Sequence, residues 1–183
     1  MEILHDYVFN ENGCWDQVTN DATWQCDLNN GAYIQNKNLV LTSDNSYAQL
    51  PSNILGENPT NISIELSVST GGNNIGWTRI IQFGSNQKNN ANSFALDRIA
   101  SNYNNNHHPY KIMLEYFPSN FPTADNVKFQ AYSNVTFNNQ DHLYIVILIA
   151  IGQPVVLYIN SVKFESVKEI PIEILSTTPS LAN

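Results

Sequence analysis

The sequence predicts an all-β protein, a sandwich of two antiparallel β-sheets, and three observations favour this fold class. Apolar and polar residues alternate with a period of two along several segments, as they do in strands that bury one face. Loops of Asn, Gly, Ser and Pro, which tolerate or preset turn dihedrals, separate these segments. No stretch of 12 or more residues keeps a helical period. About a dozen short strands at regular spacing are typical of a two-sheet sandwich.

The clearest strand covers residues 61–69, with the sequence NISIELSVS. Its apolar residues all lie at even positions and its polar residues at odd positions, so one face is buried and the other is solvated. Tyr110 to Tyr116 repeats the pattern, with Met113 on the polar side. Val127 to Ala131 repeats it again, with the apolar residues facing inward.

Seven shorter segments complete the predicted strands. In chain order they are Tyr7–Phe9, Leu39–Thr42, Tyr47–Leu50, Arg79–Phe83, Ser93–Asp97, Val155–Asn160 and Ile170–Leu175. Asn29-Asn30-Gly31 is a strong signal for a tight turn, because Asn and Gly accept positive φ. The chain contains 28 Asn, many of them in pairs between the strands, where we expect them to form turns; a bias in composition is the other explanation of the excess.

The stretch from Leu143 to Ile159 is apolar on both faces and is interrupted by Gly152-Gln153-Pro154. It predicts a central hairpin whose first strand is covered on both sides. The longest apolar run has nine residues, from Leu143 to Ile151, whereas a helix across a bilayer needs about 20. We therefore expect no membrane insertion.

Length and charge limit the partners. The chain has 183 residues without a dividing linker, so we expect a single domain over residues 1–183. With 16 acidic and 8 basic residues its formal charge is −8, and we expect no binding to nucleic acid, which needs clustered Lys and Arg. The first six residues show no positively charged or apolar signal region, so no signal peptide is visible.

Five segments carry a family resemblance. They are Tyr7–Phe9 followed by Asp16, Asn20–Thr23 and Gly31-Ala32; Leu39–Leu41 with Tyr47–Pro51; Asn61–Ser69; Arg79–Gly84; and His142–Phe164 with Val156–Asn160. Taken in order they resemble the laminin G-like, concanavalin A-like jelly roll, over about Tyr7 to Leu175. The sequence departs from that family's pattern near Asp141-His142, where a Trp is usual, and at Ser161, where a Gly follows the Asn.

The resemblance implies a jelly-roll sandwich and a non-enzymatic module that binds a glycan or a protein, extracellular or attached to a surface. Some members use calcium, which makes calcium the candidate cofactor here, although no ligand set matches residue by residue. The alternative is a structural or self-associating protein of a virion, appendage or extracellular layer. The charge-poor, amide-rich composition and the absence of a visible signal peptide motivate that alternative.

A glycoside hydrolase is a third, less favoured hypothesis. Glu169 to Glu173 (EIPIE) resembles the ExDxE catalytic strand of a hydrolase family with this fold, in which alternating carboxylates share one face of a cleft. Pro171 replaces the middle Asp and removes a ladder donor, which favours an edge strand with solvated carboxylates.

Two aromatic regions are candidate ligand sites. Tyr103, His107, His108 and Tyr110 lie in or beside the loop SNYNNNHHPY, which could grip a sugar or hold a metal, or could be a solvated loop. Trp77 follows a Gly- and Asn-rich segment and is either a ligand platform at a loop tip or a cap on the core.

Acidic residues and cysteines leave two further questions open. Asp16, Asp21, Asp44 and Asp97 are loop or strand-end acids that could join a calcium site, with low specificity. Cys14 and Cys26 either form a disulfide, which requires an oxidising compartment, or are unrelated thiols. No zinc-type spacing of Cys and His is present.

Overall fold

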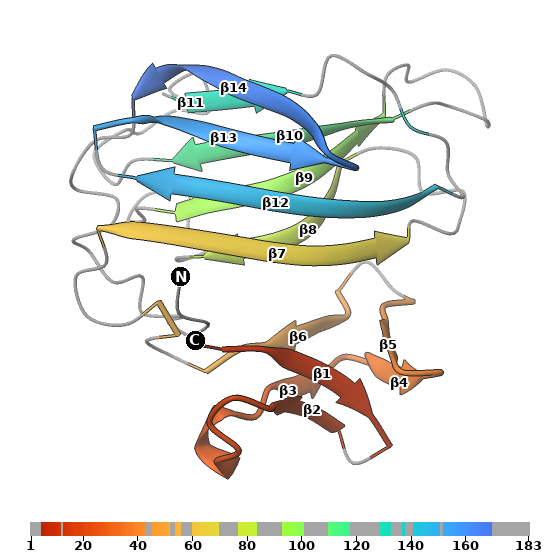
Figure 1. Ribbon diagram of the computed structural model, residues 1–183. Coiled ribbons are helices and arrows are strands. Elements are labelled where there is room, and N and C mark those ends of the chain that lie inside the picture. The colour runs from red at the N-terminus through yellow and green to blue at the C-terminus, as the bar shows by residue number, and fades with distance from the viewer. Residues whose placement is uncertain are drawn as a thin grey trace. The chain divides into compact units, whose positions relative to one another are not determined.

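The computed structural model describes residues 5–11, 13–42, 45–51, 54–55, 60–69, 77–83, 93–100, 110–117, 129–132, 137, 141–150 and 152–169. The chain divides into two compact units, residues 1–54 and 55–183, each of which is described by itself. Apart from one 3₁₀ turn, the regular elements of the described residues are β-strands, and every pairing between them is antiparallel (Figure 1). The all-β class is confirmed.

In the first unit the described residues form three two-stranded sheets. The pairs are β1 (Tyr7–Asn10) with β2 (Gly13–Asp16), β3 (Asp27–Asn29) with β6 (Tyr47–Gln49), and β4 (Tyr33–Gln35) with β5 (Asn38–Val40). A 3₁₀ turn, η1 (Ala22–Trp24), follows β2 and begins at Asp21, whose side chain accepts a hydrogen bond from the Thr23 N–H. These strands are short, so the unit depends on its turns and crosslinks.

Left-handed residues make two of those turns. Asn30 (φ 52°) and Gly31 (φ 82°) are the central pair of a turn closed by the Ala32 N–H, which donates to the Asn29 carbonyl at 3.0 Å. The tight turn predicted from Asn29-Asn30-Gly31 is therefore confirmed. Asn36 and Lys37 have φ of 51° and 62° and connect β4 to β5 by the same two-residue geometry.

A disulfide joins Cys14 of β2 to Cys26, with Cα atoms 5.4 Å apart. The Cys26 N–H also donates to the Cys14 carbonyl at 3.3 Å, so a covalent bond and a hydrogen bond close the same loop. Of the two possibilities that the sequence left open, the structure has the crosslink. Trp15 and Trp24, on either side of the loop, are half-buried.

The described residues of the second unit form two four-stranded antiparallel sheets, and Figure 1 shows one sheet in front of the other. The front sheet has the order β14 (Val162–Glu169), β13 (Pro154–Ile159), β12 (His142–Ala150), β7 (Asn61–Ser69). The other has the order β11 (Phe129–Tyr132), β10 (Tyr110–Phe117), β9 (Ser93–Ala100), β8 (Trp77–Phe83). The edge strands β11 and β14 are in contact.

The core of this unit follows from the period of two. On β12 every second residue is buried, namely Leu143, Ile145, Ile147 and Ile149. On β13 the buried residues are Val155, Leu157 and Ile159, and Phe164 continues the row on β14. Each such side chain contributes roughly 1.5–3 kcal/mol when fully buried. The register of β7 on β12 is continuous from Asn61 to Ser69, so no slip disturbs this alternation.

Two burial predictions are wrong. Met113 was expected on a polar face, but Ile112, Met113 and Leu114 are all buried, so β10 is covered on both faces at these three positions. The first strand of the hairpin was expected to be covered on both sides, but Tyr144 is 49% exposed and Leu148 38% exposed. Tyr144 and Leu148 alternate with the buried residues of β12, so their side chains lie on the opposite face of the sheet. Because β12 is mostly apolar, its composition does not show that this second face is exposed.

The hairpin of β13 and β14 closes through Asn160 (φ 48°) and Ser161 (φ 70°). Ser161 thus adopts the left-handed conformation that a Gly adopts more easily. The Asn160 N–H donates to the Tyr144 carbonyl at 2.9 Å, and its side-chain oxygen accepts from the Tyr144 N–H at 2.8 Å. Asn160 therefore holds the turn against the neighbouring strand β12.

Most predicted strands are present within a few residues of their expected ends, and Asn61–Ser69 matches β7 at both ends. The sequence did not predict β2, β3, β4 or β14, which lack a long alternating pattern. Ile170–Leu175 lies outside the described residues. The expectation of one domain over residues 1–183 stays a prediction.

Replacing Ser161 by Gly is expected to stabilise the protein. A left-handed non-Gly residue costs about 1–2 kcal/mol, and the greater entropy of Gly in the unfolded chain offsets part of the gain. We expect a net gain of about 0.5–1 kcal/mol, measured by urea unfolding. Ser63→Gly, in the middle of β7, is the matched control and is expected to destabilise. A lower urea midpoint for Ser161→Gly would contradict the turn geometry.

Removing the disulfide is expected to destabilise the first unit. In the variant Cys14→Ser/Cys26→Ser, the loss is roughly 3 kcal/mol on the loop-entropy estimate. The measurement is urea unfolding followed by tryptophan emission in a Trp77→Phe background, which leaves Trp15 and Trp24 as reporters. Dithiothreitol should reproduce the loss in the parent protein and have no effect on the double variant. Equal unfolding midpoints with and without the cysteines would refute the role of the crosslink.

Candidate functional site

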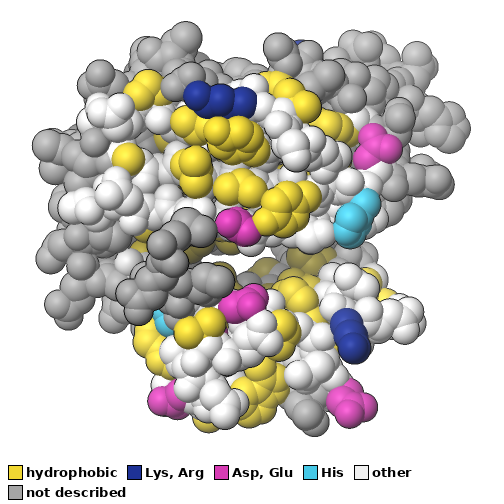
Figure 2. Space-filling view, viewed as in Figure 1, with side chains coloured by type: hydrophobic (Ala, Val, Ile, Leu, Met, Phe, Trp, Pro, Cys, Tyr) yellow, Lys and Arg dark blue, Asp and Glu magenta, His cyan; other side chains and the backbone are white. Residues whose placement is uncertain are grey.

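Part of the outward side of the front sheet, on β7, β12 and β13, is a continuous surface that we call the outer face. It consists of Glu65 and Ser67 on β7, His142, Tyr144, Val146 and Leu148 on β12, and Val156 and Tyr158 on β13. Register pairs these residues in rows, with Ser67 opposite Tyr144, Val146 between Glu65 and Tyr158, and Leu148 opposite Val156. In the space-filling view, hydrophobic side chains gather over this sheet, with His and acidic side chains beside them (Figure 2).

Tyr144 is the most exposed aromatic residue of the outer face, at 49%. Its hydroxyl donates to the Glu65 carboxylate at 2.5 Å, along the diagonal between β12 and β7. This hydrogen bond, together with desolvation and the negative charge of Glu65, raises the pKa of Tyr144. The bond fixes the direction of the ring, because both ends of the side chain are now held.

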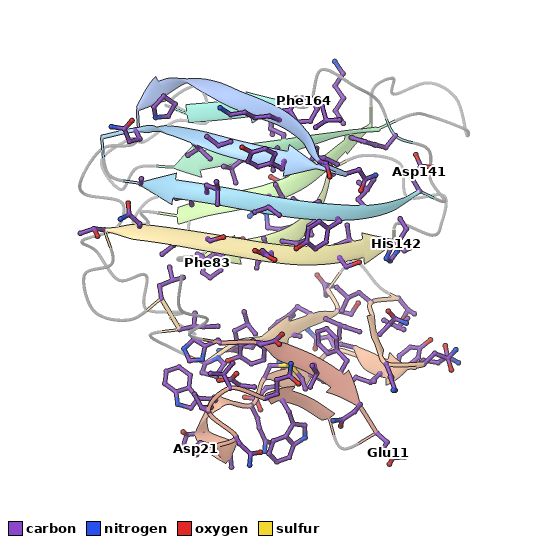
Figure 3. The ribbon with its side chains drawn as sticks, in the orientation of Figure 1. Glu11, Asp21, Phe83, Asp141, His142 and Phe164 are labelled. Atoms are coloured by element: carbon purple, nitrogen blue, oxygen red, sulfur yellow. A yellow bond between two sulfur atoms is a disulfide. The ribbon has the colours of Figure 1, made fainter. Side chains whose placement is uncertain are left out.

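A second diagonal pair lies beside the first. The Ser67 hydroxyl and His142 Nε2 are 2.8 Å apart, and both side chains are exposed. Figure 3 shows His142 at the end of the sheet where β7 terminates. The two pairs bring a carboxylate, a phenol, a hydroxyl and an imidazole together along the border of β7 and β12.

The other side of the outer face is apolar. Val146, Val156 and Tyr158 are half-buried, and Leu148 is 38% exposed. Cross-strand neighbours on one face of a sheet lie within contact distance, so these residues cover a continuous area. The outer face is therefore amphipathic, with hydrogen-bonding groups along the border of β7 and β12 and apolar groups on the rest of β12 and on β13.

The backbone beneath Tyr144 is fixed on both sides. Its N–H and carbonyl both bond to Asn160, and its neighbours Leu143 and Ile145 are fully buried. Sites built on such strands hold their geometry better than sites on loops. The outer face is thus a preformed surface.

The chemical groups of the outer face can be considered for catalysis and for ligand binding in turn. Ser67 and His142 resemble a nucleophile and its base, but nucleophilic catalysis also needs a group that orients the base and donors for an oxyanion. The described contacts of this pair include neither. An aromatic ring beside fixed donors and acceptors can instead bind a ligand that is apolar on one side and hydroxylated on the other.

A second polar cluster lies in the first unit, around Asp16, which is 1% exposed. Its carboxylate accepts four hydrogen bonds, from His5 Nδ1 at 2.8 Å, the Asp6 N–H at 3.0 Å, the Val18 N–H at 3.1 Å and the Thr19 hydroxyl at 2.8 Å. An ionised carboxylate only accepts, so His5 carries a proton on Nδ1. The His5 ring also lies 4.3 Å from the Trp24 ring, between centroids.

Opposing effects set the ionisation of Asp16. Burial favours the neutral acid, but the hydrogen bonds from His5, Asp6, Thr19 and Val18 outweigh it and hold the pKa of Asp16 well below its usual range. Its cross-strand neighbour is Tyr7, where burial and the Asp16 charge raise the pKa to about 12. The Tyr7 hydroxyl is buried and has no hydrogen-bond partner among the residues that the structure describes. Asp16 therefore stays charged and anchors the turn after β2.

The candidate calcium ligands are used in other ways. Asp16 has its acceptor sites filled, and Asp21 begins η1. Asp97 lies within β9 rather than at a strand end, is 2% exposed, and pairs with Arg79 Nε at 3.0 Å across the sheet. Asp44 lies outside the described residues. Within the described residues there is no group of three or more His, Cys, Asp or Glu that could hold a metal ion.

The predicted ligand residues are largely untested. Tyr103, His107 and His108 lie outside the described residues. Trp77 begins β8 and Tyr110 begins β10, but their side chains are outside the description. The structure therefore neither gathers these residues nor separates them, and their role stays a prediction.

The residues of the outer face were missed by the sequence analysis. The signal that could have identified them is the alternation within β12, where His142, Tyr144 and Val146 share one face and differ from the purely aliphatic buried row. The strand was interpreted as buried throughout because Val146 and Leu148 are as apolar as the core residues.

No protein family matches the chain, and comparisons with curated proteins and with solved structures find no match either. The part of the chain that the structure describes contains no helix with the length and apolar character needed to cross a membrane. The function must therefore be inferred from the surface chemistry.

Asp16 makes the stability of the first unit sensitive to acid. Because its pKa is lower in the folded protein than in the unfolded chain, its stabilisation is complete above pH 4 or so and declines as the pH falls below that value. Asp16→Asn is expected to cost about 2–3 kcal/mol at pH 7 and to flatten the loss of stability below about pH 4. Urea unfolding at a series of pH values measures both effects.

Asp21→Asn, at an exposed carboxylate, is the control, and its free energy of unfolding should change with pH as in the parent protein. An unchanged slope in Asp16→Asn would contradict the assignment.

Proposed function

We propose that this protein is a non-enzymatic recognition module that binds a glycan through the outer face. The observation that carries the proposal is the exposed ring of Tyr144, fixed beside the hydrogen-bonding groups of Glu65, Ser67 and His142. A sugar ring has an apolar face of C–H groups, which packs on an aromatic ring, and an edge of hydroxyls, which needs donors and acceptors. The outer face presents both kinds of partner side by side.

The fold that we propose is a laminin G-like jelly-roll sandwich. Two four-stranded antiparallel sheets and the contact between β11 and β14 support it. The late hairpin, in which Asn160 bonds to Tyr144, also fits the Tyr-Ile-Asn segment that resembles this family. The Cys14–Cys26 disulfide favours an oxidising compartment, which supports an extracellular or surface location.

A glycan fits the outer face better than a protein does. Protein interfaces concentrate a contiguous apolar patch of several hundred Å². Here Val146, Val156 and Tyr158 are half-buried, and only Tyr144 and Leu148 of the described outer face count among the exposed large hydrophobic residues. The polar groups beside them are already aligned by hydrogen bonds, which favours a small hydroxylated ligand. A protein partner remains the alternative ligand.

Self-association is the second candidate function, and β7 favours it. Among the described strands β7 pairs only with β12, so its other edge has no described strand beside it. Its sequence, NISIELSVS, contains neither Pro nor Lys, the residues that commonly protect an edge from pairing. Ordered oligomers at micromolar concentration, seen by size-exclusion chromatography with light scattering, would favour a structural or assembly protein.

The hydrolase hypothesis stays the least favoured. Glu169 ends β14, an edge strand in its sheet, while residues 170–173 lie outside the described residues. A catalytic strand would line the middle of a sheet. Release of reducing sugar from a polysaccharide, abolished by Glu169→Gln, would overturn the non-enzymatic proposal.

Tyr144→Ala is expected to remove glycan binding, because it deletes the ring and the donor to Glu65. On a broad glycan array, followed by calorimetry, we expect at least about a 30-fold loss of affinity, or about 2 kcal/mol. Tyr47→Ala is the matched control, because Tyr47 is 46% exposed in the other unit. Calcium or EDTA is added in parallel to test the candidate cofactor. If no glycan binds the parent protein, or if both variants lose affinity equally, the outer face is not the site.

A further inference from the structure

We infer that the outer face selects uncharged glycans and rejects acidic ones, an inference that rests on the proposed function. The selection would be made by the carboxylate of Glu65, which belongs to the outer face. Its carboxylate is exposed on β7 and directed by the hydrogen bond from Tyr144. A ligand stacked on the Tyr144 ring therefore meets a carboxylate at the edge of that ring.

The carboxylate suits the hydroxyls of a neutral sugar. An ionised carboxylate accepts at about four lone-pair positions on two oxygens. The Tyr144 hydroxyl uses one of them, at Oε2. The remaining acceptor positions can take two neighbouring hydroxyls of one sugar, and charge-assisted bonds of this type are stronger than neutral ones.

The same carboxylate disfavours an acidic sugar. A uronate, sialate or sulfate group placed at the hydroxyl edge would stand within a few Å of Glu65, where like charges repel. The formal charge of the whole chain, −8, adds a weaker repulsion of the same sign. Both effects act against anionic glycans, the net charge during approach and Glu65 once the ligand lies on the Tyr144 ring.

One basic residue, Lys163, lies in the same cross-strand row as Glu65, but it is too far away to reverse this selection. Lys163 on β14 lies opposite Tyr158, in the row that runs from Glu65 through Val146 and Tyr158. Three strand spacings separate Lys163 from Glu65, about 14 Å. A sugar stacked on Tyr144 cannot place one acidic group against both. His142 borders the polar side, and its Nε2 forms a hydrogen bond with the Ser67 hydroxyl.

The test compares neutral and acidic hexasaccharides on the full chain at pH 7. The neutral probes are oligomers of glucose, galactose, mannose and xylose, and the acidic probes are oligogalacturonate and a heparin-derived hexasaccharide. Calorimetry is run at 20 and 200 mM NaCl. We expect at least one neutral probe to bind with little salt dependence, and the acidic probes to bind at least tenfold more weakly.

Two charge-removing variants locate the effect. Glu65→Gln is expected to weaken the neutral probe about three- to tenfold and to strengthen acidic probes. Glu11→Gln removes the same charge from an exposed position in the first unit and should change neither. Circular dichroism and melting temperature establish that both variants fold.

The outcomes separate the two proposals. Tighter binding of an acidic probe, lost in Tyr144→Ala but not improved in Glu65→Gln, would overturn the selectivity while leaving glycan recognition intact. Equal effects of Glu65→Gln and Glu11→Gln would show that net charge acts instead of Glu65, and would also overturn it. Failure of every neutral and acidic probe to bind would refute the proposed function itself.

Discussion

The pleat of β12 is the constraint on which the second unit depends. A strand that buries Leu143, Ile145, Ile147 and Ile149 must direct the residues between them to the opposite side. The core and the outer face are consequently two results of one register. A slip by a single residue would bury Tyr144 and expose the aliphatic row, and the continuous pairing from His142–Ser69 to Ala150–Asn61 opposes such a slip.

The first unit is held together by different forces. Its buried residues within the described ranges are Cys14, Asp16, Ser46 and Cys26, and none of them is a large aliphatic residue. A short chain with little apolar burial needs other stabilisation, and here a disulfide and a charged hydrogen-bond network supply it. The stability of the two units therefore depends on different chemical conditions, because a change of redox state or pH acts mainly on the first unit.

Local pattern explains how far the sequence could predict this fold. Strand β7 was predicted to the residue because four apolar and five polar side chains alternate without interruption. The Asn30-Gly31 turn was predicted because those residues accept the required φ. By contrast, β2, β3 and β4 have three or four residues each, too few to display a period. Their pairing depends on tertiary contacts, such as the bonds from Asp6 and Thr19 to Asp16, which no spacing in the sequence displays.

The candidate site was less predictable than the fold, since it consists of residues 75 and 79 positions apart in the chain, joined by diagonal contacts between strands.

The separation of the outer face from the core has a consequence for evolution. Ser67, Glu65 and Tyr144 contribute little to the core, whose side chains lie on the other side of the same strands. Substitutions at outward positions can then accumulate almost independently of those that fold the protein. The scaffold can acquire a new ligand through a few exchanges on one surface, without passing through an unstable intermediate sequence.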